Sequence, residues 1–201
     1  MILNLSDLKD YADALAKRVP GIAHRVTIKE PGISADDLSK FLAGMCLPPI
    51  YVRCISALNL FGVAIGYFSV WPGSIKAGNM VEALLRANQG DYLGAHEARE
   101  STLVVVAQEE SNLICVGQAD SDLPDTVYLL DVMRSPKIER MEVAPDFEKF
   151  LLLAGNLHDI GRKYEGNISA GMAEMLDCCQ HFACTNNQIS FWTSRVETVV
   201  S

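Results

Sequence analysis

The stretch that decides the fold covers residues 103–144 and reads LVVVAQEESNLICVGQADSDLPDTVYLLDVMRSPKIERMEVA. It contains four short apolar runs rich in β-branched residues, and polar turns separate them. Such runs predict strands, which we expect at residues 103–107, 113–117, 127–132 and 138–144. The connections between them are too short for crossover helices, so neighbouring strands should pair antiparallel.

Apolar residues at helical spacing flank this segment on both sides. We expect helices at residues 6–19, from 34, at 50–58, 79–88, 145–157 and 169–182, and a weaker helix from 190. Ser6 and Asn79 are the expected N-caps of two of them. Residues 24–29 predict a short strand, and 62–70 a buried strand. The predicted class is α+β: a twisted, mostly antiparallel sheet of about five to six strands, with helices covering one face.

Composition limits the class of protein further. The chain has 201 residues, of which 49% are hydrophobic, so it can bury a core without disulfides or metal. No run of about 18 apolar residues is present, which argues against a membrane span. Asp7, Asp10 and Asp13 lie near the N-terminus, where a signal peptide needs a basic start and an apolar run, so we expect a cytoplasmic protein. Its cysteines should be reduced, and most of them buried.

Charge is unevenly distributed along the chain. The net charge of −8 argues against nucleic-acid binding, which needs a basic face. Residues 90–150 contain 13 acidic and 5 basic side chains and carry the whole imbalance. A solvated sheet face explains this excess, and so does a surface that attracts a basic protein. The second alternative predicts a partner-binding surface at Glu109, Glu110, Asp120, Asp122 and Asp125.

The sequence gives only weak evidence for catalytic or metal-binding residues. Cys178, His181 and Cys184 are close in sequence, but no paired CxxC motif accompanies them, so we expect core or surface residues and no metal. His158-Asp159 lacks the further ligands of a metal phosphohydrolase, and residues 120–125 lack the glycine of a calcium loop. No motif for catalysis or for cofactor binding is present, so we expect neither enzyme activity nor a cofactor.

Five short sequence motifs occur along the chain in the same order as in a known protein family. They are LPPIY at 47–51, VVVA at 104–107, NLICV at 112–116, TVYLLD at 126–131 and APDFEKFL at 144–151. Together they resemble the SUKH superfamily, also called the Smi/Knr family, over residues 33–157. The chain differs from the family pattern at Leu60 and at Glu109-Glu110-Ser111, where the family carries glycines, and residues 158–201 have no counterpart.

The resemblance implies a twisted antiparallel sheet packed against helices. It also implies a non-catalytic domain that binds another protein, as bacterial immunity proteins of this superfamily bind a cognate toxin, often a nuclease. The alternatives are a regulatory or structural interaction domain without a toxin partner and, less favoured, a metal-dependent enzyme. We expect an N-terminal helix and lead-in strand at 1–32, the SUKH-like core at 33–157 and a helical extension at 158–201. The sequence leaves the oligomeric state open.

Overall fold

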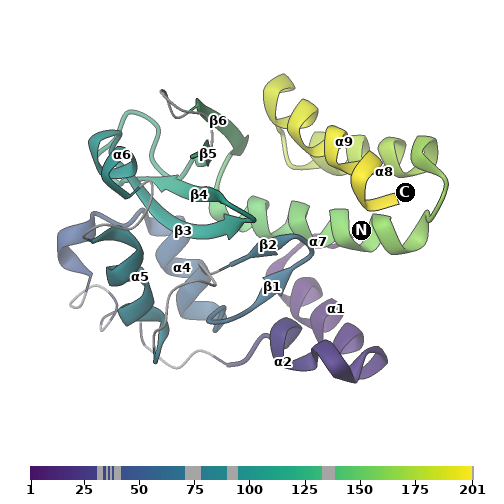
Figure 1. The fold of residues 1–201 in the computed structure, drawn as a ribbon, viewed down its shortest axis with the longest axis horizontal. Coiled ribbons are helices and arrows are strands. Elements are labelled where there is room, and N and C mark those ends of the chain that lie inside the picture. The colour runs from purple at the N-terminus through teal and green to yellow at the C-terminus, as the bar shows by residue number, and fades with distance from the viewer. Residues whose placement is uncertain are drawn as a thin grey trace.

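The protein folds as an α+β structure in which one antiparallel sheet wraps around a long helix (Figure 1). This computed structural model describes residues 1–30, 34, 36, 38, 42–70, 78–89, 95–132 and 139–200. The α+β class predicted from the sequence is therefore confirmed. The expected helix from Ser34 lies mostly outside the described residues, as does the turn at 71–73.

The sheet has six strands in sequential order, and every neighbouring pair is antiparallel. Its strands are β1 (Ala64–Ile65), β2 (Phe68–Ser69), β3 (Leu103–Glu109), β4 (Asn112–Gly117), β5 (Val127–Asp131) and β6 (Glu139–Ala144). The last four match the runs predicted from the sequence. The expected strand at 62–70 is wrong as a single strand: Gly66, at φ +59°, reverses the chain between β1 and β2.

Both faces of the sheet are buried at its central strands β3, β4 and β5, which differs from the single covered face that we expected. Alternate residues of β3, such as Val104 and Val106, join the main core together with the long helix α7 (Phe147–Lys163). Leu103 and Val105 point the other way, into a smaller apolar cluster. Helices α5 (Met80–Asn88) and α6 (Ala95–Glu100) contact β3 and contribute Ala87 and Ala98 to that cluster.

The remaining helices surround α7. In Figure 1, α1 (Leu5–Arg18) and α2 (Ala23–Val26) lie on one side of α7, and α8 (Ile168–His181) and α9 (Asn186–Val200) lie on the other. The helix α4 (Pro49–Ala57) packs against α7, and short 3-10 turns occur at η1 (Pro20–Ile22) and η2 (Ala43–Met45). One main core extends from Ile2 to Val200, so it includes residues from all three ranges into which the sequence was divided.

Some local predictions need correction. Residues 24–29 form no strand: α2 covers the first part, and only Lys29 makes a single β-bridge, to Asn59. The N-cap of α1 is Asn4 rather than Ser6, because the Asn4 side chain accepts the backbone N–H of Asp7. Asn79 caps α5 as predicted, through the N–H of Glu82. Helix α7 is longer than expected because it continues past residue 157 through Lys163.

Two buried asparagines fasten backbone segments to helices. The Asn156 amide on α7 accepts the N–H of Ile2 at 2.8 Å and donates to the Ile2 carbonyl at 2.9 Å. The Asn88 amide on α5 does the same with Val105 on β3, at 2.8 and 2.9 Å. Each amide thereby pairs polar backbone groups that burial would otherwise leave without partners.

Candidate protein-binding surface

The acidic loop, residues 118–126, connects β4 to β5 and is tightly held. Thr126 O accepts the N–H of Gly117 at 2.9 Å, and Ser121 donates to Gln118 O through both its backbone N–H and its hydroxyl. A Cβ added to Gly117 would lie 2.3 Å from Leu123 O, so only glycine lets the loop fold back this closely. The loop is therefore ordered before any partner arrives, which lowers the entropy cost of binding.

The acidic loop is also anchored to the segment that leads into α4. The Asp125 carboxylate accepts the N–H of Ile50 at 3.0 Å, in the first turn of α4, whose own N-cap residue is Pro48 and offers no side-chain cap. The N–H of Ala119 donates to Cys46 O at 2.8 Å. Burial raises the pKa of Asp125 above its ordinary value, although backbone N–H groups of α4 oppose this shift. Asp125 is thus a structural helix cap as well as a predicted partner contact.

The loop presents a small surface in which charge and apolar area combine. Asp120 and Asp122 are exposed, and Leu123 beside them is 49% exposed. Within the described part of the chain, no cation forms an ion pair with either carboxylate. Exposed carboxylates accelerate capture of a basic protein, and an apolar side chain next to them can supply contact energy once it is covered.

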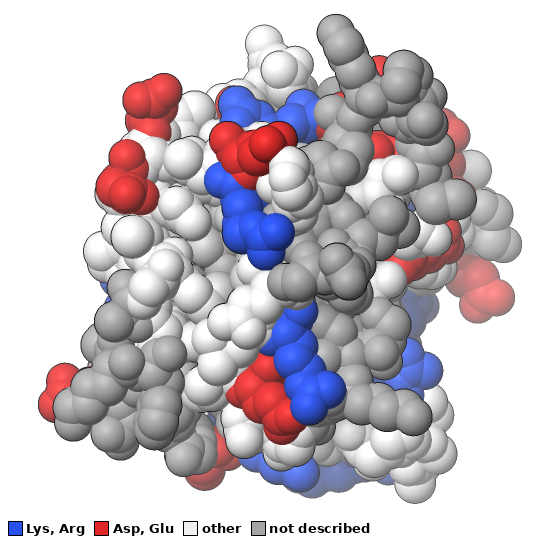
Figure 2. Space-filling model, turned by 60° about the vertical axis from the view of Figure 1, so that its left-hand side comes forward, with Lys and Arg blue, Asp and Glu red and all other residues white. Residues whose placement is uncertain are grey.

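Further carboxylates lie near this end of the sheet, but they have local partners. Asp146 caps α7 by accepting the N–H of Lys149 at 2.9 Å, and its other oxygen lies 3.0 Å from the Lys149 ammonium. Glu148 pairs with Arg53 of α4 at 2.6 Å. Figure 2 shows the molecule turned so that the left-hand side of Figure 1 comes forward. Acidic and basic side chains stand next to each other along its middle, and further acidic groups lie apart at its margin.

Glu109 and Glu110, the other two predicted contacts, lie at the opposite end of β4. The six residues of β4 separate them from the acidic loop by roughly 20 Å. Both carboxylate oxygens of Glu109 accept hydrogen bonds from Arg195 of α9, at 2.7 and 2.6 Å, and the Arg195 guanidinium lies 3.5 Å from the ring centre of Phe191. Glu110 is exposed in the β3–β4 turn. The structure therefore divides the five predicted positions into two separate groups.

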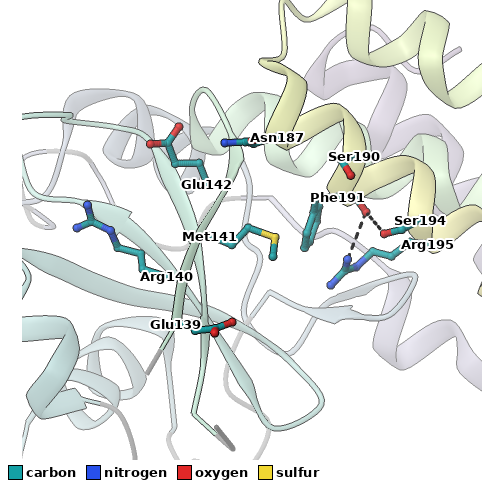
Figure 3. Close-up of a pocket in the computed structure, with 9 residues that line it drawn as sticks. All are labelled: Glu139, Arg140, Met141, Glu142, Asn187, Ser190, Phe191, Ser194 and Arg195. Carbon is teal, nitrogen blue, oxygen red and sulfur yellow. Dashed lines mark hydrogen bonds between the residues drawn. The ribbon is translucent and has the colours of Figure 1, made fainter. Parts of the chain in front are cut away.

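A groove of about 560 Å³ separates β6 from α9 (Figure 3). One wall consists of consecutive residues of β6, and the other belongs to α9. Its lining residues are Glu139, Arg140, Met141, Glu142, Asn187, Ser190, Phe191, Ser194 and Arg195. Met141 points across the groove towards Phe191. Because this lining mixes charged, hydroxyl and apolar groups, the groove suits polypeptide better than a small apolar ligand.

The candidate metal ligands do not converge. Cys178 is buried, His181 is exposed, and Cys184 is half-buried against the main core. Burial raises the pKa of Cys178 to about 11, and a hydrogen bond between Cys179 and Cys184 raises the pKa of the first and lowers that of the second. Among the described residues, no three His, Cys, Asp or Glu side chains come together as a metal-binding group.

His158 forms a contact that sequence reasoning missed. Its Nδ1 lies 2.8 Å from the Tyr11 hydroxyl, so it links α7 to α1. Burial lowers the pKa of His158, with a smaller contribution from Arg162, and burial raises the pKa of Tyr11 to about 12. The space beside them is only about 10 Å³, too small for a substrate. This pair is a packing contact between helices.

Comparisons of the chain with protein-family models, with curated proteins and with solved structures find no match. Across the residues that the structure describes, no helix combines the length and apolar character that crossing a membrane requires.

Proposed function

We propose that this protein is a non-catalytic domain that binds a basic protein through the acidic loop. The observation that carries the proposal is the exposed Leu123, which follows the exposed carboxylates of Asp120 and Asp122 in the acidic loop. Hydrogen bonds to Gly117 of β4 and to Cys46, before α4, hold this loop in place. A preorganised loop loses little entropy on binding, and its exposed carboxylates favour a cationic partner.

The partner class that we propose is a toxin, with basic nucleases as the first candidates, and the role is neutralisation of an immunity type. A protein that holds phosphate groups presents Lys and Arg side chains, and these match carboxylates on an inhibitor. We place this encounter in the cytoplasm, where six free cysteines stay reduced. The resemblance of residues 33–157 to SUKH proteins agrees with the proposal.

The test compares variants in a pull-down from lysate of the source organism. The wild-type protein should retain a stoichiometric basic protein, and the double variant Asp120→Lys/Asp122→Lys should lose it. Glu110→Lys is the matched control, because it reverses an exposed charge at the far end of β4 and should leave capture unchanged. Leu123→Ala should weaken capture without changing net charge.

Co-expression then tests neutralisation. The captured protein should arrest growth alone, and growth should recover with the wild-type protein but not with the double variant. Capture that persists after both loop charges are reversed would contradict the proposed surface. Growth arrest that the wild-type protein fails to relieve would contradict the immunity role, and would leave a regulatory interaction domain as the better description.

A further inference from the structure

Strand β6 forms an edge of the sheet. It pairs with β5 on one side, and no strand of the described chain pairs with its other side. A β-bulge at Val143 ends the regular pairing, and the Val143 carbonyl accepts the indole N–H of Trp192 at 2.7 Å. Among the described residues, the part of this edge that can accept another strand is therefore centred on residues 140–142. An exposed edge of this kind is a template for pairing with a further strand.

The side chains of this edge alternate between the two faces of the sheet. Arg140 and Glu142 lie on the face of Tyr128: the Arg140 guanidinium is 4.7 Å from the Tyr128 ring centre, and Glu142 is the register partner of Tyr128. Met141 lies on the opposite face, beside α9, and is 45% exposed.

The charges along this edge would match those of a second copy of the same strand. When two copies of a strand run antiparallel about a two-fold axis through Met141, residue 140 of each faces residue 142 of the other. Arg140 then lies opposite Glu142 of the partner subunit, and the reciprocal pair forms by symmetry. Directly opposed side chains of opposite charge stabilise antiparallel pairing, and like charges in these positions destabilise it.

We propose that β6 pairs antiparallel with β6 of a second copy of this chain, about a two-fold axis at Met141, to form a homodimer with one continuous sheet. A two-fold interface must be complementary to itself, and the sequence Arg140-Met141-Glu142 meets that condition. The groove of about 560 Å³ along this edge provides space in which the second strand can lie beside α9.

This interface is separate from the acidic loop, so the two proposals can fail independently. The loop lies between β4 and β5, whereas the dimer axis passes through the middle of β6. Dimerisation would give each assembly two copies of the acidic loop.

The test is sedimentation equilibrium of the full chain over a concentration series up to several hundred micromolar. The wild-type mass should rise with concentration from 22.0 kDa to twice that value. Arg140→Glu and Glu142→Arg each place like charges opposite one another in both symmetric pairs. Each should weaken dimerisation about tenfold or more, since two attractive pairs become repulsive.

The combined variant Arg140→Glu/Glu142→Arg restores opposite charges and should restore the dimer. Lys17→Glu, an exposed charge reversal on α1, is the control and should leave the mass unchanged. Circular dichroism of each variant separates loss of dimer from loss of fold. A wild-type protein that stays at 22.0 kDa throughout would overturn the proposal, as would a folded double variant that remains monomeric where the wild type dimerises.

Discussion

Replacing Asn156 with alanine should release the start of the chain from α7. The Asn156 amide makes two hydrogen bonds to the backbone of Ile2, and a third to the carbonyl of Leu152 within its own helix. The side chain is almost fully buried, and Ile2 packs into the main core beside it. The substitution removes the amide and leaves the Ile2 N–H and carbonyl without these partners.

The size of the effect follows from these contacts. Each of the two bonds to Ile2 contributes about 1 kcal/mol net, so their loss costs about 2 kcal/mol. Ile2 can escape the cost of unpaired buried groups by leaving its site. That movement gives up side-chain burial of about 1.5–3 kcal/mol but recovers about 1–2 kcal/mol of conformational entropy per released residue. The expected loss of unfolding free energy is about 2–3 kcal/mol.

Urea unfolding followed by circular dichroism measures this loss, and Asn88→Ala is the matched comparison. Asn88 makes the same pair of bonds to Val105, but Val105 lies inside β3 and cannot leave the sheet. Asn88→Ala should therefore cost more, about 3 kcal/mol, because the unpaired groups stay buried. A loss below about 0.5 kcal/mol for Asn156→Ala, or a larger loss there than at Asn88, would refute this reasoning.

Two further predictions concern α7. Gly161→Ala should destabilise the protein by about 1–2 kcal/mol in urea unfolding, because the new Cβ would lie 2.9 Å from the carbonyl oxygen of Val199 and force α9 away. Gly21→Ala, where nothing lies within 4 Å, should change stability by less than about 0.5 kcal/mol; equal losses at the two sites would contradict the close approach of α7 and α9. His158 has a lowered pKa in the folded state, so the unfolded chain binds more protons near its ordinary value of 6.5, and stability should fall as pH drops through that value. Thermal unfolding from pH 7.5 to 5.5 should show a smaller decrease for His158→Gln than for the wild type, and an unchanged decrease would show that other groups cause it.

The strands of residues 103–144 could be predicted because their signals are local. Each strand has its own apolar run and its own polar turn, and antiparallel order follows from the short connections. The hairpin of β1 and β2 was missed because its apolar run continues through the turn, and Gly66 was the only local sign of reversal. Helix α6 was missed because its sequence, AHEARE, is only six residues long and four of those residues are polar.

The roles of the acidic residues could not be predicted from the sequence, because their partners are distant in the chain. Asp125 caps a helix whose first turn contains Ile50, 75 positions away, and Glu109 pairs with Arg195, 86 positions away. A net charge counts all carboxylates equally, whichever contacts they make. The exposure of Leu123 could be predicted from the sequence, because a leucine between Asp122 and Pro124 is expected in a turn and not in a strand. The structure places Leu123 in the acidic loop, where it is exposed.

These internal roles reduce the part of the acidic excess that a partner can use. Several carboxylates between residues 90 and 150 cap helices or form ion pairs, namely Glu109, Asp125, Asp146 and Glu148. Exposed charge pairs contribute little binding energy in water, so the two loop aspartates mainly increase the rate of encounter. Affinity must then come from apolar surface that the partner covers, and Leu123 is the largest exposed apolar side chain within the acidic loop. The acidic composition and the exposed leucine therefore have different roles in the proposed complex: the first guides a basic protein to the loop, and the second holds it there.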